Sequence, residues 1–234
     1  MKYNTRGIAL SYIKYGESSI ISKIFTEERG LQNYIIKGVR YKKTKKKLML
    51  FEPLQLLQIN ASYFAKKSLQ HINEITLSEN QSLIFKNIKN KFMLTFVAEV
   101  LSKSLLENEK DEKLFDFVWG LKLLLVAKRE VDMLFPLDFL LKLSHYFGFP
   151  PSKEKIQKNT YFDMQKGMFV ESINQSTTTE KNSRHLKSIL LNESVKIPYA
   201  ERTCLLHMIF DYYTHHGHEL KNMKSHLILK SLQN

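Results

Sequence analysis

Residues 31–38 read Leu-Gln-Asn-Tyr-Ile-Ile-Lys-Gly, and residues 50–59 read Leu-Phe-Glu-Pro-Leu-Gln-Leu-Leu-Gln-Ile. Both runs are short, rich in Ile, Leu and aromatic residues, and bounded by Gly or Pro, which predicts two β-strands. We therefore expect the segment between them to be a loop held by a sheet. That segment carries no acid but six cations and one aromatic ring: Arg40, Tyr41, Lys42, Lys43, Lys45, Lys46 and Lys47. Repulsion among these cations favours an anionic partner, although a solvated loop without a specific partner is the alternative.

The first third of the chain contains five strand-like runs in close succession, over residues 5–14, 18–26, 31–37, 50–60 and 68–77. In the first run Ile8, Leu10 and Tyr12 alternate with Ala9 and Ser11. A hairpin loop at 27–30 ends in Gly30, where a positive φ is wanted. Five short strands bury their edges most economically by closing into a barrel, and a barrel of this size is an OB-fold, which commonly binds oligonucleotides.

The loop between the predicted fourth and fifth strands, residues 60–67, combines two rings with two cations, Tyr63, Phe64, Lys66 and Lys67. Rings stack bases and cations contact phosphates, so this combination is typical of a single-strand binding site. Ordinary hairpin packing of Tyr63 and Phe64 is the alternative. We expect these four residues, Lys37 and the basic loop to contact nucleic acid.

Charge supports the same interpretation. The chain has 234 residues and a formal net charge of +13. Residues 1–78 hold 14 Lys and Arg against five Asp and Glu, a net charge of +9 in one third of the sequence. A compact basic region favours nucleic acid as the partner, with an anionic membrane surface second. No amphipathic basic helix accompanies the loop, so we expect no membrane binding.

From about Glu79 the apolar period changes to three or four residues, which predicts helices. The predicted fold is therefore of the α+β class, with an OB-fold barrel over residues 1–78 and an all-helical domain over residues 79–234. Within the second domain, residues 150–176 lack a helical period and read as a loop or small β element. The predicted helices cover residues 92–105, 114–125, 134–147, 178–192, 199–216 and 224–232.

The N-terminal third resembles the RecO family of bacterial DNA-repair mediators. The resemblance rests on residues 5–10 (Thr-Arg-Gly-Ile-Ala-Leu), 15–19 (Tyr-Gly-Glu-Ser-Ser), 24–30 (Ile-Phe-Thr-Glu-Glu-Arg-Gly), 36–40 (Ile-Lys-Gly-Val-Arg) and 50–54 (Leu-Phe-Glu-Pro-Leu). It is clear over about the first 80 residues, and the run from Tyr15 to Gly30 is its most specific part. The helical remainder agrees in architecture more than in individual residues.

The resemblance implies a mediator that catalyses no bond chemistry. RecO proteins bind single- and double-stranded DNA, anneal complementary strands, act with RecR to load RecA onto DNA coated by single-stranded-DNA-binding protein (SSB), and contact the SSB C-terminal tail. On this basis the predicted partners are DNA, RecR, the SSB tail and, indirectly, RecA. An adaptor that acts mainly through its helical domain on the SSB tail is one alternative, and an RNA-binding OB-fold protein is another.

One departure from the family concerns metal. Many members carry a four-cysteine zinc motif in the helical domain, whereas residues 148–169 of this chain contain no Cys. We therefore predict a degenerate, metal-free insertion near 150–176, with Phe162 and Phe169 as its apolar anchors. His215, His216 and His218 are too close in sequence to converge readily on one ion.

Other chemistries have little support in the sequence. The single cysteine, Cys204, lies in an apolar run, so we expect a buried, inert thiol in a cytoplasmic protein. No phosphate-binding loop, nucleophile elbow or paired-carboxylate motif is present, so we expect neither an enzyme nor a cofactor.

Overall fold

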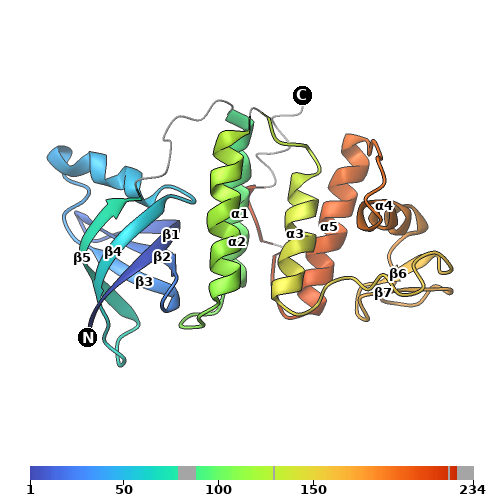
Figure 1. Cartoon of the computed structure of the whole chain (residues 1–234), viewed down its shortest axis with the longest axis horizontal. Helices are drawn as coiled ribbons and strands as arrows, with labels where there is room; N and C mark the ends of the chain where they lie inside the picture. The colour runs from blue at the N-terminus through green and yellow to red at the C-terminus, as the bar shows by residue number, and fades with distance from the viewer. Residues whose placement is uncertain (79–87, 129, 221, 226–234) are drawn as a thin grey trace. The chain divides into compact units, whose positions relative to one another are not determined.

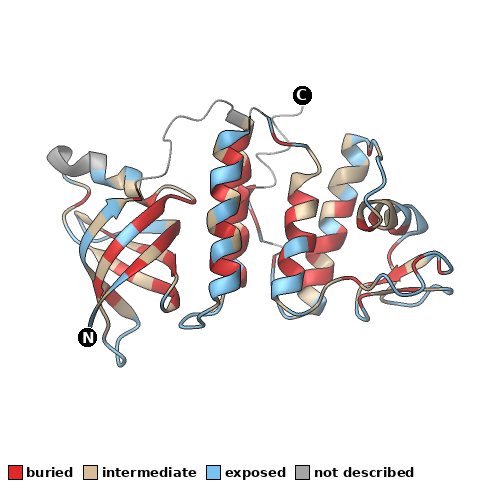
Figure 2. Ribbon diagram, viewed as in Figure 1, coloured by how far each residue is buried: buried red, intermediate tan, exposed pale blue. Residues whose placement is uncertain are grey.

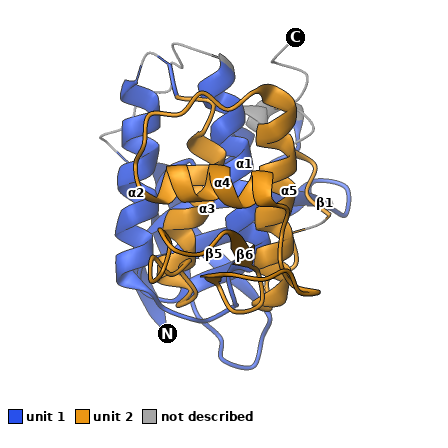
Figure 3. Ribbon diagram, turned by 90° about the vertical axis from the view of Figure 1, so that its right-hand side faces the viewer, with its two compact units in different colours: residues 1–131 blue, residues 132–234 orange. Residues whose placement is uncertain are grey.

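The structure is a computed structural model that describes residues 1–78, 88–128, 130–220 and 222–225, without the side chains of residues 42–46 and 88. It contains two compact units, residues 1–131 and 132–234, which Figure 3 colours separately. The predicted domain boundary lies between residues 78 and 79, and among the described residues the barrel strands end at Leu77 and the helices begin at Ile88. Unit 1 nevertheless contains both the strands and the first two helices. A domain boundary at this position therefore remains a prediction.

Unit 1 begins with a closed five-stranded barrel, in the order β1-β2-β3-β5-β4 (Figure 1). The pairs are antiparallel except for β3 with β5, which are parallel. This is the predicted OB-fold barrel. Its strands are β1 (Lys2–Tyr15), β2 (Ser19–Thr26), β3 (Gly30–Ile36), β4 (Leu56–Ser62) and β5 (Leu69–Leu77).

Small and branched apolar side chains, with two aromatic rings, fill the inside of the barrel. The buried cluster is Ala9, Ile20, Ile24, Tyr34, Val39, Phe51, Leu57, Ile59 and Ala61. Figure 2 shows the resulting alternation of buried and exposed residues along the strands. The Tyr34 hydroxyl lies 2.7 Å from that of Tyr3, so its polar end is satisfied inside the apolar cluster.

The alternation expected for β1 is interrupted, because this strand contains a β-bulge. Ala9 pairs with Ile24 and Ser11 with Lys23, so the intervening Leu10 has no partner of its own on β2. Because neighbouring side chains point to opposite faces, one extra residue reverses every later position. Tyr12 therefore pairs with buried Ser22 on the inner face, and Ile13 lies on the outer face.

The segment between β3 and β4 also differs from the expectation. Instead of a loop followed by a strand from residue 50, a 3₁₀ helix η1 (Lys42–Phe51) precedes β4, which begins at Leu56. Leu48 and Phe51 lie three residues apart, the spacing of this helix type, and Leu54 follows shortly after the helix ends. Phe51 and Leu54 are fully buried, so the apolar run packs on the barrel rather than extending its sheet.

Two helices, α1 (Ile88–Ser104) and α2 (Glu112–Ala127), pack on part of the barrel's outer surface. Beneath them Ile8 pairs with Phe25 and Phe25 with Leu31, and we call these three residues the covered patch. All three are buried although they lie outside the barrel interior, and the Phe25 ring meets Phe115 of α2 at 5.4 Å. The helices therefore serve as a second layer over these strands.

Unit 2 contains α3 (Phe135–Tyr146), a hairpin of β6 (Tyr161–Asp163) and β7 (Met168–Val170), α4 (Glu180–Leu190) and α5 (Tyr199–His215). Tyr212 and Tyr213 of α5 donate hydrogen bonds to the carbonyls of Phe149 and Leu140, respectively. The expectation that the Cys204 thiol is buried is wrong, because Cys204 is exposed. The buried stripe of α5 follows Leu205, Ile209 and Tyr212 instead. The last predicted helix, 224–232, lies outside the described residues apart from its first two.

The hairpin occupies the region predicted as a loop or small β element. Phe162 and Phe169 are fully buried, with ring centroids 5.4 Å apart. Asp163 caps the turn: its Oδ1 accepts hydrogen bonds from the Gln165 and Lys166 amides, and its Oδ2 accepts one from Asn174. Burial disfavours the ionised carboxylate, but these donors outweigh it and lower the pKa of Asp163. An apolar pair and a capped turn thus hold this hairpin.

Candidate nucleic-acid interface

A row of three isoleucines and one histidine crosses four strands on the outer face of the barrel. Ile13 pairs with Ile21, Ile21 with Ile35, and Ile35 with His71. We call these four residues the open row. Paired residues lie side by side on one face, and the neighbouring pair Ile20 and Ile36 faces the core, so the open row faces outward. Ile13 is 64% exposed, unlike any member of the covered patch.

A polar row separates the open row from the covered patch. It consists of Ser11, Lys23 and Asn33, which are paired in that order across β1, β2 and β3. Each makes a hydrogen bond to the end of α1 or the segment after it. Ser11 meets the Ser102 hydroxyl at 3.2 Å, Lys23 donates to the Ser102 carbonyl, and Asn33 donates to the Glu107 carboxylate. This row therefore marks where the helical layer ends on the sheet.

The loop between β4 and β5 adds an aromatic ring beside the open row. Phe64 is 42% exposed, its ring centroid lies 6.0 Å from that of His71, and Lys67 Nζ lies 5.0 Å from its centre. The buried Gln70 side chain fixes this loop, because it accepts from the Phe64 amide and donates to the Phe64 and Lys67 carbonyls. The structure thus brings Phe64 and Lys67, both predicted from the sequence, together with His71.

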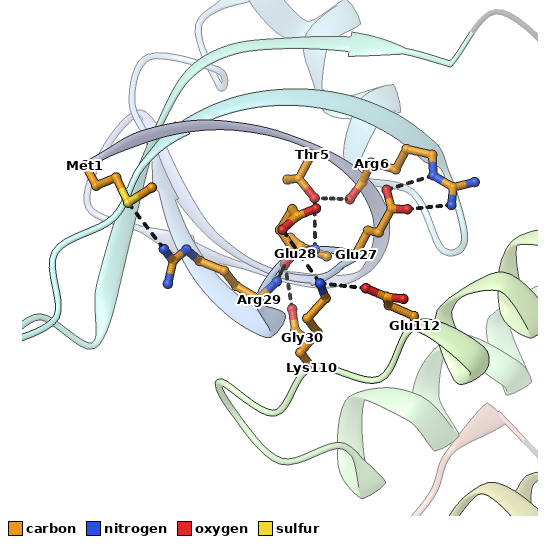
Figure 4. A network of polar contacts seen from close by, with 10 residues as sticks. Met1, Thr5, Arg6, Glu27, Glu28, Arg29, Gly30, Lys110 and Glu112 are labelled. Atoms are coloured by element: carbon orange, nitrogen blue, oxygen red, sulfur yellow. Dashed lines mark hydrogen bonds and ion pairs between the residues drawn. The ribbon is translucent and has the colours of Figure 1, made fainter.

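Tyr63 lies in a different environment from Phe64. The Arg29 guanidinium carbon sits 3.9 Å from the centre of the Tyr63 ring and 5.0 Å from that of Tyr3. In Figure 4 Arg29 extends from the β2–β3 loop toward Met1, whose sulfur is 3.8 Å from its guanidinium. One face of the Tyr63 ring is therefore occupied within the protein. This geometry favours the packing alternative for Tyr63, although its role in binding remains a prediction.

The basic loop supplies cations beside the Ile35–His71 pair of the open row, where Lys37 and Lys47 line one pocket with these two residues. Lys37 and Lys47 are exposed, as is Lys66 in the β4–β5 loop. Tyr41 is 61% exposed, whereas Arg40 donates a hydrogen bond of 2.7 Å to the Gly16 carbonyl and so joins this segment to the β1–β2 loop. The remaining predicted residues, Lys42, Lys43, Lys45 and Lys46, lie in η1, and their side chains are outside the described part of the structure.

The arrangement is suited to a polyanion that also presents flat apolar groups. Apolar and aromatic side chains lie along the open row, with Lys67 at the Phe64 ring and Lys37 and Lys47 beside Ile35 and His71. An OB-fold presents this strand 2–3 face, bordered by the β1–β2 and β4–β5 loops, to oligonucleotides. Sequence reasoning missed Ile13, Ile21, Ile35 and His71, because their common face follows from strand register and the bulge. The only signal available was that each lies in a predicted strand.

Several residues that carry the family resemblance form a separate network at the β2–β3 loop (Figure 4). Arg6 makes a two-pronged pair with Glu27, at 2.9 and 2.7 Å, and also reaches Asp116 of α2 at 2.8 Å. The Arg6 hydrogen bond lowers the pKa of Glu27, and burial opposes that shift only in part. These signature residues therefore join the barrel to α2, at a site distinct from the open row.

Gly30 explains the close approach of the helical layer at this loop. Its φ is +63°, as expected for the hairpin. A Cβ built on Gly30 would lie 1.8 Å from the Glu109 carbonyl oxygen, in the segment between α1 and α2. Both the backbone conformation and the available space therefore require glycine here.

No helix among the described residues has the length and apolar character needed to cross a lipid bilayer. Likewise, within the described ranges, no three His, Cys, Asp or Glu side chains gather in a way that would hold a metal ion.

A closed barrel with this strand order, followed by helices, defines an α+β protein with an N-terminal OB-fold. Comparison with known families agrees over nearly the whole chain. The family model "Recombination protein O N terminal" matches residues 1–81, and "Recombination protein O C terminal" matches residues 86–221. The chain belongs to the RecO family of DNA repair and recombination proteins.

Individual relatives cover the chain from end to end. The "DNA repair protein RecO" of Flavobacterium johnsoniae is 31% identical over 237 residues, which is 99% of each chain. The protein of the same name from Bacteroides fragilis is 29% identical over 241 residues, again 99% of each chain. That of Porphyromonas gingivalis is 27% identical and covers 97% of this chain and 98% of its own. The similarity therefore includes the helical part as well as the barrel.

Proposed function

We propose that this protein is a DNA-binding mediator of recombinational repair, and that its barrel binds single- and double-stranded DNA across the open row. The observation that carries the proposal is the register of Ile13, Ile21, Ile35 and His71, which places an apolar surface between the β1–β2 and β4–β5 loops. Bases would lie on this surface and on Phe64. A base–ring stack contributes about 1–3 kcal/mol in such sites.

Electrostatics would provide most of the affinity. The predicted phosphate contacts are Lys37, Arg40, the lysines of η1, Lys66 and Lys67. Their binding would release condensed counterions, and screening of the repulsion between two strands would favour annealing. These steps involve no bond chemistry. As a member of the RecO family, the protein would act with RecR and the SSB C-terminal tail to assist RecA loading, which we also propose.

Salt dependence tests the electrostatic mechanism. Fluorescence anisotropy with a labelled single strand, measured at several salt concentrations, gives the slope of log K against log salt. With about five phosphates contacted, the expected slope is about −3.5. Replacing Lys37, Lys66 and Lys67 with Glu should remove three contacts and bring the slope to about −1.4. A wild-type slope near zero would contradict the mechanism.

A matched control tests the placement of the site. Lys153, Lys155 and Lys158 are also exposed and lie close together in sequence, but they belong to unit 2. Their replacement with Glu changes the net charge equally and should leave the slope near its wild-type value. An equal loss from both triple variants would mean that total charge, and not this surface, determines binding.

A further inference from the structure

The barrel separates locally between β3 and β5. These strands pair only over Asn33–Ile35 with Leu69–His71, whereas β5 continues to Leu77 with β4 on its other side. Beyond the last pair, Ile35 and His71, a pocket of 320 Å³ opens between the two strands and η1. Figure 1 shows η1 over the end of the barrel at which β5 finishes. Since Ile35 and His71 belong to the open row, the pocket continues that surface.

The lining of the pocket combines apolar walls with a cationic rim. Ile36, Phe51, Ile72 and Ile75 line it from β3, η1 and β5, and Lys37 and Lys47 also belong to its lining. No carboxylate is among its lining residues. These residues suit a ligand with a flat part that packs against the Ile and Phe side chains and an anionic part that meets the lysines. Its volume lies at the lower end of the about 300–1,000 Å³ typical of ligand pockets.

We infer that this pocket receives one unstacked nucleotide of a bound single strand. The base would enter between the apolar walls, and its phosphate would lie between Lys37 and Lys47. His71, at the junction of open row and pocket, would contact the base edge or its sugar. This inference rests on the proposed function, because the strand must first lie on the open row. Enzymes that take a base out of its stack hold it in a pocket between aromatic or apolar side chains.

The inference is tested on the full-length protein with an oligothymidylate that carries 2-aminopurine, whose fluorescence rises when the base leaves its stack. At saturation the wild type should raise the fluorescence. Ile75→Trp fills the pocket, so it should abolish the rise and weaken binding by about 5- to 150-fold, the loss of one base contact. A wild-type rise that persists unchanged in saturated Ile75→Trp would overturn the inference.

A second pair of variants keeps the test decisive if Ile75→Trp fails to fold. Lys47→Glu introduces an anion at the pocket, whereas Lys66→Glu makes the same charge change in the β4–β5 loop, and both residues are exposed. Both should weaken binding, but only Lys47→Glu should reduce the fluorescence of the saturated complex. Equal fluorescence in the two complexes would contradict a nucleotide site here.

Two further outcomes separate this inference from the proposed function. Wild type that binds the strand with the expected salt slope but without a fluorescence rise would refute the pocket alone. Absence of any strand binding would refute both proposals.

If an acidic peptide with a C-terminal aromatic residue bound wild type but not Ile75→Trp, and the base signal were absent, the pocket would be a peptide site and the inference would be wrong.

Discussion

The outer face of β1, β2 and β3 carries two apolar surfaces that differ in what lies over them. The covered patch, Ile8, Phe25 and Leu31, is buried beneath the helical layer, and Phe25 contacts the Phe115 ring. The open row comes from the same strands a few residues away and continues to His71 of β5, yet Ile13 remains 64% exposed. An isolated exposed Ile needs no explanation, but a row across four strands is a candidate binding surface. The difference indicates that one surface stabilises the fold and the other is available to a ligand.

Truncation of one residue from each surface tests this comparison with the largest expected effect. Phe25→Ala should lower the free energy of unfolding by about 3–5 kcal/mol, because it removes a buried ring and leaves a cavity. Ile13→Ala should cost less than about 1 kcal/mol, since most of its side chain is already in water. Urea unfolding monitored by circular dichroism measures both. A loss of similar size for the two variants would show that the open row is not a free surface.

The glycines of the two hairpin loops provide a second test of where the helical layer sits. Gly30 and Gly16 have similar φ values, +63° and +56°, but only Gly30 faces a carbonyl, whereas nothing lies within 4 Å of a Cβ on Gly16. We expect Gly30→Ala to lower the free energy of unfolding by about 2–4 kcal/mol and Gly16→Ala by about 1 kcal/mol. Equal losses would mean that backbone strain alone acts at Gly30, without a contribution from the Glu109 segment.

The smallest expected effect is the acid sensitivity of stability that comes from the pair of Glu27 with Arg6, where the barrel meets α2. The folded state lowers the pKa of Glu27 from its ordinary 4.5 through its hydrogen bond to Arg6. The stability that this pair contributes is therefore present above pH 4.5 and is lost as the pH falls through the lower folded pKa. Between about pH 5 and 3, wild type should lose about 1 kcal/mol more stability than Glu27→Gln.

Glu28→Gln is the control for that measurement. The Glu28 carboxylate is half exposed and lies 3.8 Å from Lys110, with no closer partner among the described ion pairs. Such a pair contributes little, so this variant should follow the wild-type pH dependence. If Glu28→Gln and Glu27→Gln behaved alike, the two-pronged contact with Arg6 would have no special role in stability.

The residues that made the family recognisable and those proposed to bind DNA are largely different. Arg6, Glu27 and Gly30 belong to the resemblance, and the structure places them where the barrel meets the α1–α2 segment. Their role is explained by stability, because substitution would disturb a close contact. The resemblance therefore identified the family correctly, while the interface had to be built from other residues.

The sequence by itself determined the five strands, the barrel, the change from strands to helices and the basic character of the first third. Each of these follows from local pattern, because alternation, Gly and Pro positions and charge act within a few residues. The same patterns predicted Phe64 and Lys67 as candidate contacts. They also misread residues 50–55 as strand, since a short apolar run bounded by a turn residue fits a buried strand as well as the end of a helix.

Only the tertiary structure decided which side chains share the outer face. The bulge at Leu10 places Ile13 outside instead of inside, and the parallel pairing of β3 with β5 places His71 beside Ile35. Packing of η1 against the barrel end then creates the pocket beyond that pair. Register, bulges and the cover of a helix depend on contacts between residues far apart in the chain, which is why the sequence pattern could not supply them.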